Sequence, residues 1–227
     1  MKYILIPVKD LDQAKQRLAC LMTQEERTSL AWLMLQRVFS EVAATPGYDR
    51  VAVVTCYEPA IGLGQQLGFE ILRETEQVSE SSSVDQASQV VCASGAISVL
   101  RLPIDLPLVI SADIATLLDR SGKNCDCPAA VIAVSRDGSG TNALSRTPPD
   151  LFPSHFGPDS LVKHRAEAIR CQARCEVLYL PSVACDMDDP SDVAFFLRQG
   201  AKNHVYDFLM DLRIDRRLKK IEAASGR

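Results

Sequence analysis

The sequence predicts an α/β fold in which helices cover a central, mostly parallel sheet. Short continuous apolar runs alternate along the chain with longer segments of helical periodicity. Continuous apolar strands are typical of sheets buried on both faces, and their alternation with helices is typical of parallel sheets. Because 227 residues with 47% hydrophobic content suffice for one well-buried core, we expect a single domain over residues 1–227.

The first two elements are a strand and a long helix. Residues 3–8 form a short apolar run that ends in a charged loop. Thr23 then opens a helix, because Glu26 stands three residues later and the two residues form a capping box. Apolar residues recur around this helix, so we expect it to be covered on more than one side. They are Leu30, Trp32, Leu33, Met34, Leu35, Val38 and Phe39.

The remaining elements continue the alternation of strands and helices. The polar run at residues 79–83 is expected to be a loop between two of them. Further strands are expected at residues 51–55, 69–72, 97–102, 129–134 and 176–180. Further helices are expected at residues 59–67, 84–93, after Ser111, and at 160–173 and 190–199, the last with a proline in its first turn.

Residues 203–227 are expected to form an amphipathic helical tail with a basic end. We favour a solvated helix that packs on the body of the protein over one that binds an anionic partner, because charge runs are usually solvated faces. The apolar surfaces of this tail and of the helix at residues 23–42 exceed what one core needs, which predicts a homodimer.

Composition and charge exclude several classes of protein. The net charge of −4 argues against nucleic acid binding, which usually needs a basic surface. No apolar run reaches the roughly 18 residues of a membrane-spanning helix, and the N-terminus lacks the features of a secretory signal. We therefore expect no membrane partner and a cytoplasmic location. The absence of a GxxxxGK[ST] motif excludes a P-loop NTPase.

Eight cysteines could suggest disulfides, but disulfide scaffolds are usually short and secreted. Most of these cysteines stand beside apolar residues, and we interpret them as small buried hydrophobes. The weaker alternative is a zinc site in which two pairs of cysteines have C-x-C and C-x3-C spacing and the usual C-x2-C pair is missing. Its ligands would be Cys125, Cys127, Cys171 and Cys175.

The first of five candidate motifs is IPVKDLDQAKQRL, at residues 6–18. A strand ends within it, and the loop that follows carries Lys9, Lys15 and Arg17. In an open α/β sheet, ligands bind beyond the carboxyl ends of the strands. Three cations at that position suit a polyphosphate. An ordinary charged loop is the open alternative.

Two acidic motifs suit a hard divalent cation. Asp105 follows a strand within LPIDLPLV and is framed by prolines, whereas Asp186 and Asp188 alternate within CDMDDP, so that both can point to one side. Carboxylates are preferred ligands of such cations. The alternatives are a turn at Asp105 and, in CDMDDP, the N-cap of the next helix, a role that fits Asp189 better than Asp186.

Two glycine-containing motifs suit an anion. The glycines of SRDGSGTNAL allow close backbone approach, and Thr141 and Asn142 offer hydrogen bonds. In SHFGPDSLVKH, Gly157 precedes a helix start whose exposed amides, with the Ser160 hydroxyl, can bind an anion. His164 follows about one turn later. A plain glycine turn and a plain helix cap are the alternatives.

In this order, the five motifs together resemble the 2-phospho-L-lactate guanylyltransferases and their bacterial relatives that use phosphoenolpyruvate or 3-phospho-D-glycerate. The blocks that carry the resemblance lie between Ile4 and about Leu197 and are specific as a set: IPVK…AK.RL, LP.DLPL, DG.GTNAL, FGPDS…H and D.D.P. The resemblance implies a GT-A-like nucleotidyltransferase fold with a Rossmann-like nucleotide half. It also implies an enzyme of coenzyme F-420 biosynthesis that uses GTP and Mg²⁺ to transfer GMP to a small phosphorylated three-carbon acid.

The resemblance further implies roles for individual residues. The Mg²⁺ ion would be held by Asp105 and Asp186, with Asp188 adjacent. The acid would be bound by Thr141, Asn142, Gly157, Ser160 and His164. Catalysis would depend on Lys9, Lys15 and Arg17, which face the triphosphate, and on Asp105. The nucleotide would be bound by Lys9, Thr55 and Asp85.

The sequence departs from the family in one place. Relatives often have Gly-Leu-Asn before the helix that follows the nucleotide-base loop, whereas this chain has SSSVDQAS, with Asp85 where asparagine is expected. A carboxylate can still accept hydrogen bonds from the N1 and N2 protons of guanine. Two alternatives stay open: a nucleotidyltransferase of the same fold that acts on a molybdopterin or a sugar phosphate, and a nucleotide-binding protein without catalysis.

Overall fold

The computed structural model of the protein describes residues 1–76, 78–122 and 127–225, and within them a seven-stranded sheet in the order β3-β2-β1-β4-β6-β5-β7. Every neighbouring pair of strands is parallel except the two pairs that include β6, which runs antiparallel to β4 and β5. The predicted α/β fold with a mostly parallel sheet is therefore confirmed. The strands are β1 (Lys2–Pro7), β2 (Arg50–Thr55), β3 (Glu70–Arg73), β4 (Ser98–Arg101), β5 (Ala129–Val134), β6 (Thr141–Thr147) and β7 (Arg174–Leu178).

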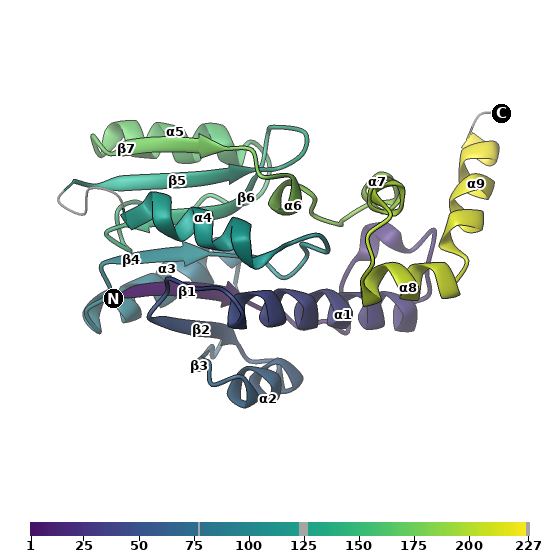
Figure 1. Ribbon diagram of the computed structural model, residues 1–227, viewed down its shortest axis with the longest axis horizontal. Helices are drawn as coiled ribbons and strands as arrows, with labels where there is room; N and C mark the ends of the chain where they lie inside the picture. The colour runs from purple at the N-terminus through teal and green to yellow at the C-terminus, as the bar shows by residue number, and fades with distance from the viewer. Residues whose placement is uncertain (77, 123–126, 226–227) are drawn as a thin grey trace.

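Helices cover both faces of this sheet (Figure 1). The helices are the 3-10 helix η1 (Gln16–Leu18), α1 (Gln24–Ala43), α2 (Glu58–Gln66), α3 (Glu80–Ala93), α4 (Ser111–Gly122), α5 (Ser160–Arg170), α6 (Pro181–Ala184), α7 (Pro190–Gln199), α8 (His204–Asp211) and α9 (Ile214–Ser225). None of the helices in the described residues is long and apolar enough to span a membrane.

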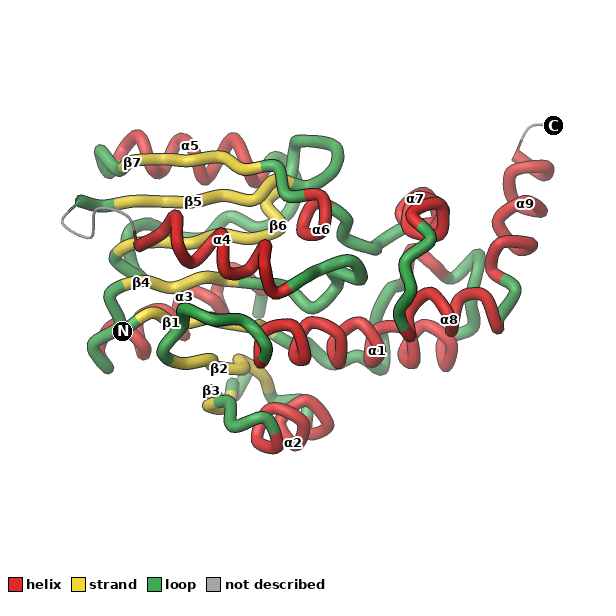
Figure 2. Tube along the Cα trace, in the orientation of Figure 1, coloured by secondary structure: helices red, strands yellow, loops and turns green. Residues whose placement is uncertain are grey.

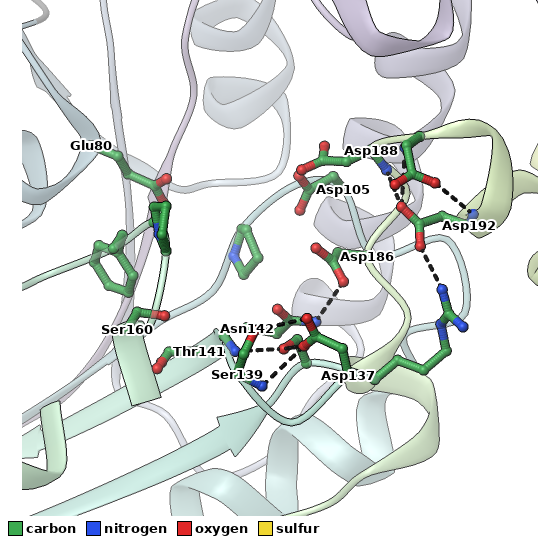
Figure 3. Close-up of a pocket in the computed structure, with 18 of the residues that line it drawn as sticks. Glu80, Asp105, Asp137, Ser139, Thr141, Asn142, Ser160, Asp186, Asp188 and Asp192 are labelled. Atoms are coloured by element: carbon green, nitrogen blue, oxygen red, sulfur yellow. Dashed lines mark hydrogen bonds and ion pairs between the residues drawn. The ribbon is translucent and has the colours of Figure 1, made fainter. Parts of the chain in front are cut away.

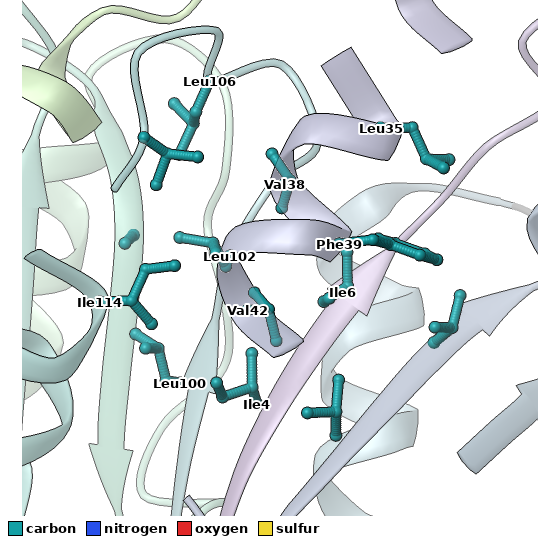
Figure 4. Packing of buried hydrophobic residues seen from close by; sticks show 14 of the residues in the cluster. Ile4, Ile6, Leu35, Val38, Phe39, Val42, Leu100, Leu102, Leu106 and Ile114 are labelled. Atoms are coloured by element: carbon teal, nitrogen blue, oxygen red, sulfur yellow. The ribbon is translucent and has the colours of Figure 1, made fainter. Parts of the chain in front are cut away.

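The side chains of β1 alternate between the two faces of the sheet, and their contacts show which helices cover each face. Successive side chains of a strand point to opposite faces. Ile4 and Ile6 pack into the cluster that contains α1 and α4, whereas Tyr3 and Leu5 pack into the cluster that contains α3. Figure 4 shows Ile4 and Ile6 beside the side chains of α1. The continuous apolar run that predicted this strand is thus explained by burial on both sides.

A second apolar cluster lies beyond the end of the sheet, where α1 meets α7, α8 and α9 (Figures 1 and 2). Leu30 and Met34 face this helical cluster, whereas Leu35 on the same helix faces the sheet. The prediction that the long helix is covered on more than one side is confirmed. The tail contributes Val205, Leu209, Ile214 and Leu218 to the helical cluster.

Glu26 joins the start of α1 to the tail. Its carboxylate accepts from the backbone N–H of Thr23 at 2.9 Å, while the Thr23 hydroxyl accepts from the Glu26 N–H at 3.2 Å, so the predicted capping box is confirmed. The same carboxylate accepts two hydrogen bonds from Arg217 of α9, at 2.7 and 2.9 Å. Arg217 also donates to the Leu21 carbonyl at 2.9 Å.

Three elements differ from the sequence-based expectation. No strand was expected at residues 141–147, but Thr141 begins strand β6 directly after the glycine turn. The run at residues 79–83 is not a loop: α3 starts at Glu80, because the Ser79 side chain caps it by accepting from the Ser82 N–H. The tail is two helices rather than one, because Arg213 has a φ of 55° and breaks the helical path between them.

Candidate active site

Two adjoining cavities open at one edge of the sheet, where β1, β4 and β5 end and the antiparallel β6 begins. The first has a volume of about 540 Å³ and the second about 460 Å³. The first is bounded by the turn at residues 135–140 with the start of β6, by the start of α5, and by the loop at 186–189 with the start of α7. The second is bounded by the segment at residues 7–17. The wall that they share consists of Arg17, Glu80, Arg101, Pro103, Asp105 and Asp188.

Lys15 lies at this shared wall and links the two acidic motifs. Its ammonium group is 3.0 Å from Asp105 and 2.7 Å from Asp188. Burial alone would lower the pKa of Lys15, but the two carboxylates outweigh it and raise that pKa. Lys15 has a φ of 56°, a left-handed conformation that is uncommon outside glycine and is maintained only where surrounding contacts fix it. The two ion pairs are such contacts.

Asp105 lies on the shared wall, where opposite effects act on its pKa. Burial would raise its pKa, but the ammonium of Lys15, with a smaller effect of Arg101, holds the pKa of Asp105 below its ordinary value. Its backbone carbonyl accepts from the Met187 N–H at 3.0 Å. This bond ties the loop after β4 to the loop that carries Asp186, so the two acidic motifs face each other as the sequence predicts (Figure 3).

Asp186 faces the first cavity, and no lysine or arginine pairs with it in the part of the chain that the structure describes. Its Oδ1 accepts from Asn142 Nδ2 at 3.1 Å. Burial and then the negative charge of Asp105 raise the pKa of Asp186 to about 6. Two neighbouring carboxylates, one without a counter-charge, fit Mg²⁺, which takes one or two carboxylates and completes its shell with phosphates and water.

Asp188 shares Lys15 with Asp105, but its side chain is more exposed, at 44% against 25%. No group of three His, Cys, Asp or Glu side chains among the described residues is arranged to hold a metal ion. The neighbouring Asp189 caps α7, because its side chain accepts from Ser191 and Asp192. One member of the zinc alternative, Cys125, lies outside the described residues.

The turn before β6 is built around Asp137. Its carboxylate accepts from the Ser135 hydroxyl at 2.5 Å and from the Ser139 amide and hydroxyl at 3.0 and 2.7 Å. These hydrogen bonds lower the pKa of Asp137 to about 2. A Cβ on Gly140 would lie 2.7 Å from the Ser135 Oγ, so a larger residue would displace that hydroxyl from its hydrogen bonds to Asp137 and to the Gly140 N–H. The turn therefore delivers Thr141 and Asn142 to the first cavity on a rigid support.

The start of α5 supplies the other side of the first cavity. Gly157 has a φ of 112° and Asp159 a φ of 57°, and the Asp159 side chain makes no capping hydrogen bond. Two of the first amides of the helix donate to backbone carbonyls instead, that of Ser160 to Gly157 at 3.2 Å and that of Leu161 to Ser139 at 3.1 Å. The group that this helix start offers to an anion is therefore the Ser160 hydroxyl. Ser160 is buried and lines the cavity. Figure 3 shows Ser160 and Thr141 on one side and the aspartates on the other.

Three of the expected site residues line neither cavity. Thr55 is buried, donating to the Val8 carbonyl at 2.6 Å and accepting from the Tyr57 N–H at 3.0 Å. His164 is fully buried behind Thr141. Asp85 is half-buried. By contrast, Lys9 and Arg17 are exposed and line the second cavity, and Arg17 lines the first as well.

Asp85 was expected to contact the guanine base, but in the structure its carboxylate binds residues of the protein. Its carboxylate accepts from Arg146 Nη1 at 3.0 Å and from both the backbone N–H and the hydroxyl of Ser154. Arg146 is buried, and its other hydrogen bonds go to Ser88 and the Phe152 carbonyl. Asp85 therefore ties α3 to the loop before α5.

Sequence reasoning missed Arg101 and Glu80, which form an ion pair on the shared wall. Arg101 also donates to the Asn142 carbonyl at 3.0 Å, and its guanidinium carbon lies 4.1 Å from the centre of the Phe156 ring. A charged residue at the last position of a buried strand, just before Asp105, was the available signal. The Glu80 position carried none, because the run around it was expected to be a loop.

Comparisons with known proteins find guanylyltransferases over almost the whole chain. The model of the family described as Guanylyl transferase CofC like matches residues 1–226. A phosphoenolpyruvate guanylyltransferase of Rubrobacter xylanophilus is 36% identical over 192 residues, which cover 85% of this chain and 91% of that protein. A 2-phospho-L-lactate guanylyltransferase of Methanothermobacter thermautotrophicus is 29% identical over 209 residues, which cover 92% of this chain and 90% of that protein.

Solved structures share the fold. A protein described as a nucleotide-diphospho-sugar transferase, from Desulfovibrio desulfuricans G20, superposes with a TM-score of 0.77 at 15% identity, covering 96% of this chain and 97% of that one. A cytidylyltransferase from Leptospira borgpetersenii superposes with a TM-score of 0.60 at 11% identity, covering 96% and 95%. At these identities the likeness shows the fold alone, which is that of the nucleotidyltransferases.

Proposed function

The chain belongs to the family of CofC-like guanylyl transferases, and from this premise we propose that it transfers GMP from GTP to a small phosphorylated three-carbon acid in coenzyme F-420 biosynthesis. Diphosphate is the other product. Its relatives are named for phosphoenolpyruvate and for 2-phospho-L-lactate. Because 3-phospho-D-glycerate carries the same two kinds of anionic group, it is the third candidate acid.

The observation that carries this proposal is the meeting of two cavities at a wall that contains Asp105 and Asp188. The second cavity, with Lys9, Lys15 and Arg17, suits a nucleoside triphosphate. The first cavity, with the hydroxyls of Thr141 and Ser160, suits a small anion. A transfer between two substrates requires that the reacting groups meet, and the shared wall is where molecules in the two cavities come together.

The reaction is an in-line attack by a phosphate oxygen of the acid on the α-phosphorus of GTP. A new oxygen–phosphorus bond forms, the bond from the α-phosphorus to the bridging oxygen of the β-phosphate breaks, and diphosphate leaves. The attacking phosphate is already ionised at neutral pH, so no side chain has to remove a proton. Catalysis then depends on positioning and on compensation of negative charge.

The charged residues of this chain suit that task. Lys15 keeps its proton because of Asp105 and Asp188, so it can compensate phosphate charge at any pH at which the enzyme is assayed. Lys9 and Arg17 would approach the β- and γ-phosphates. Asp105 and Asp186 would hold Mg²⁺, which would supply Lewis-acid compensation of charge on the phosphates.

The test is to incubate the protein with GTP, Mg²⁺ and each of the three acids in turn, and to measure both diphosphate release and the mass of the product. We expect diphosphate only when an acid is present, together with the GMP adduct of that acid. ATP and CTP serve as nucleotide controls. Release with a sugar phosphate or a molybdopterin alone would identify a different nucleotidyltransferase, and release with no acceptor would contradict enzymatic transfer.

A further inference from the structure

His164 is enclosed beside the first cavity without lining it. Its exposed fraction is 0%. The rings of Phe152, His155 and Phe156 surround it, with centroids 6.2, 6.1 and 5.3 Å from its own. A side chain enclosed in this way has no surface for a ligand, so any effect of His164 on the acid must pass through another residue.

The backbone fixes which nitrogen of the His164 ring carries the hydrogen. The N–H of His155 points at Nε2, 2.8 Å away. A backbone amide can only donate, so Nε2 accepts, and in the neutral ring the hydrogen is on Nδ1. Burial, followed by the charges of His155, Arg146 and Arg101, lowers the pKa of His164 to about 3. The ring is therefore neutral near pH 7.

Thr141 receives the hydrogen bond that follows from this tautomer. Its Oγ1 lies 3.0 Å from Nδ1 of His164. Because Nδ1 donates, Oγ1 accepts, and the hydroxyl hydrogen of Thr141 must point in another direction. Among the described residues no acceptor for that hydrogen is found, and Thr141 lines the first cavity. The hydrogen is thus available to a ligand there.

We propose that His164 is a positioning residue that makes the Thr141 hydroxyl a fixed hydrogen-bond donor to an anionic group of the acid. The inference rests on the proposed function, because it requires the acid in the first cavity. A freely rotating hydroxyl can donate or accept, whereas one whose oxygen already accepts from a buried ring is oriented to donate before the substrate arrives. Such preorganised donors favour anions over neutral groups.

Two substitutions form a matched pair that separates the two hydrogen bonds of the ring. In His164→Gln, the side-chain oxygen can take the place of Nε2 and accept from His155, but no donor stands at the Nδ1 position. In His164→Asn, the amide nitrogen can take the place of Nδ1 and donate to Thr141, but the acceptor is lost.

We expect His164→Gln to raise the KM for phosphoenolpyruvate about tenfold, as for a lost hydrogen bond to a charged group, and His164→Asn to stay within about threefold of the wild type. The KM for GTP should not change in either variant. Thr141→Val combined with His164→Gln should be no worse than Thr141→Val alone, because the effect passes through the hydroxyl. Additive losses, or equal losses in the Asn and Gln variants, would overturn the proposal.

A measurement on the wild type does not depend on whether the variants fold. The ¹⁵N chemical shifts of the His164 ring at pH 7, without ligand, should identify the Nδ1–H tautomer. The opposite tautomer or a charged ring in a protein that turns over would overturn the inference alone. A protein with the expected tautomer that transfers GMP to none of the three acids would instead contradict the proposed function.

Discussion

Ser160 presents its hydroxyl to the first cavity from the first turn of α5, and its side chain is only 2% exposed. Ser160→Ala should raise the KM for the acid by a few-fold to tenfold, since the loss of one hydrogen bond costs roughly 1 kcal/mol. The KM for GTP should change much less. Steady-state kinetics with each substrate varied in turn measure both values, with Ser94→Ala as an exposed control at the end of α3.

The outcome of that experiment also tests the assignment of the two cavities. If Ser160→Ala raises the KM for GTP and leaves the KM for the acid unchanged, the nucleotide occupies the first cavity and the acid the second. No change in either KM would remove the start of α5 from the binding site.

Asp105→Asn and Asp186→Asn should each abolish turnover while the protein stays folded, because each removes one of the two carboxylates that fit the Mg²⁺ ion. The raised pKa of Asp186 also predicts how Asp186→Asn changes the stability of the folded protein. A carboxyl whose pKa is raised by folding destabilises the folded protein when it is ionised. Asp186→Asn should therefore unfold at a temperature no lower than that of the wild type at pH 7.

Activity assays over a range of Mg²⁺ concentrations and thermal unfolding together check these variants. Asp211→Asn, an exposed position on α8, is the matched control and should keep full activity. Near-normal turnover of either site variant at low Mg²⁺ would show that the residue is not a ligand of the ion.

Asp85→Asn separates two roles for one carboxylate. Its hydrogen bonds to buried Arg146 and to Ser154 lead us to expect a loss of about 1–3 kcal/mol in unfolding free energy, because a buried cation loses its counter-charge. The preference for GTP over ATP should then be unchanged. If the variant is equally stable but loses nucleotide preference, the carboxylate contacts the guanine base, as the sequence predicted.

At the scale of elements, the pair of Arg217 and Glu26 holds α9 against the start of α1. Arg217→Ala should lower the unfolding free energy by about 0.5–1 kcal/mol at pH 7. The Arg217 hydrogen bonds, with that of the Thr23 amide, outweigh burial and lower the pKa of Glu26. Such a carboxyl contributes stability above its unfolded pKa of about 4.3, and this is lost as the pH falls through the folded value.

Denaturant unfolding of both proteins at pH 7 and below pH 4 checks this sign. The difference between wild type and Arg217→Ala should be present at pH 7 and shrink in acid. Arg216→Ala is the control, because the Arg216 side chain on the same helix is exposed. A difference that stays the same in acid would mean that Arg217 acts through its bond to the Leu21 carbonyl rather than through Glu26.

Most elements were predictable from the sequence because local signals and burial agree. The run that became β1 is apolar on both faces, and both Thr23 and Asp189 stand where helix caps are required. β6 was not predictable in this way. It pairs on one side with β5, which directly precedes the glycine turn, and on the other side with β4, which is distant in the chain. The second pairing is tertiary, and the sequence around the turn does not show it. The start of α3 was missed because serines favour loops unless one of them caps a helix, as Ser79 does.

At the scale of the whole molecule, the sequence indicated which residues line the two cavities better than it indicated their contacts. The loops that carry Lys15 and Asp105 were expected at strand ends, and parallel strands bring such loops to one edge. The sequence could not show that Lys15 pairs with Asp188, or that His164 is enclosed by aromatic rings. Those contacts depend on the packing of segments that are distant in the chain.

The homodimer stays a prediction, but its original reason has changed. The apolar faces of α1 and of the tail, which suggested a partner, pack against each other in the helical cluster of the same chain. Static light scattering at micromolar concentration measures the oligomeric state. A monomer would reject the prediction, and a dimer would have to use a surface other than these two faces.

A product that joins a nucleotide to the acid would lie across the wall shared by the two cavities, and each half would tether the other. Once one half is seated, the local concentration of the second half beside its own cavity is roughly millimolar, as for any short covalent link between two ligands. The joined molecule therefore leaves the protein only when both halves are dissociated at the same time. A non-cleavable analogue of that molecule, which spans both cavities, should accordingly dissociate slowly and act as a tight inhibitor.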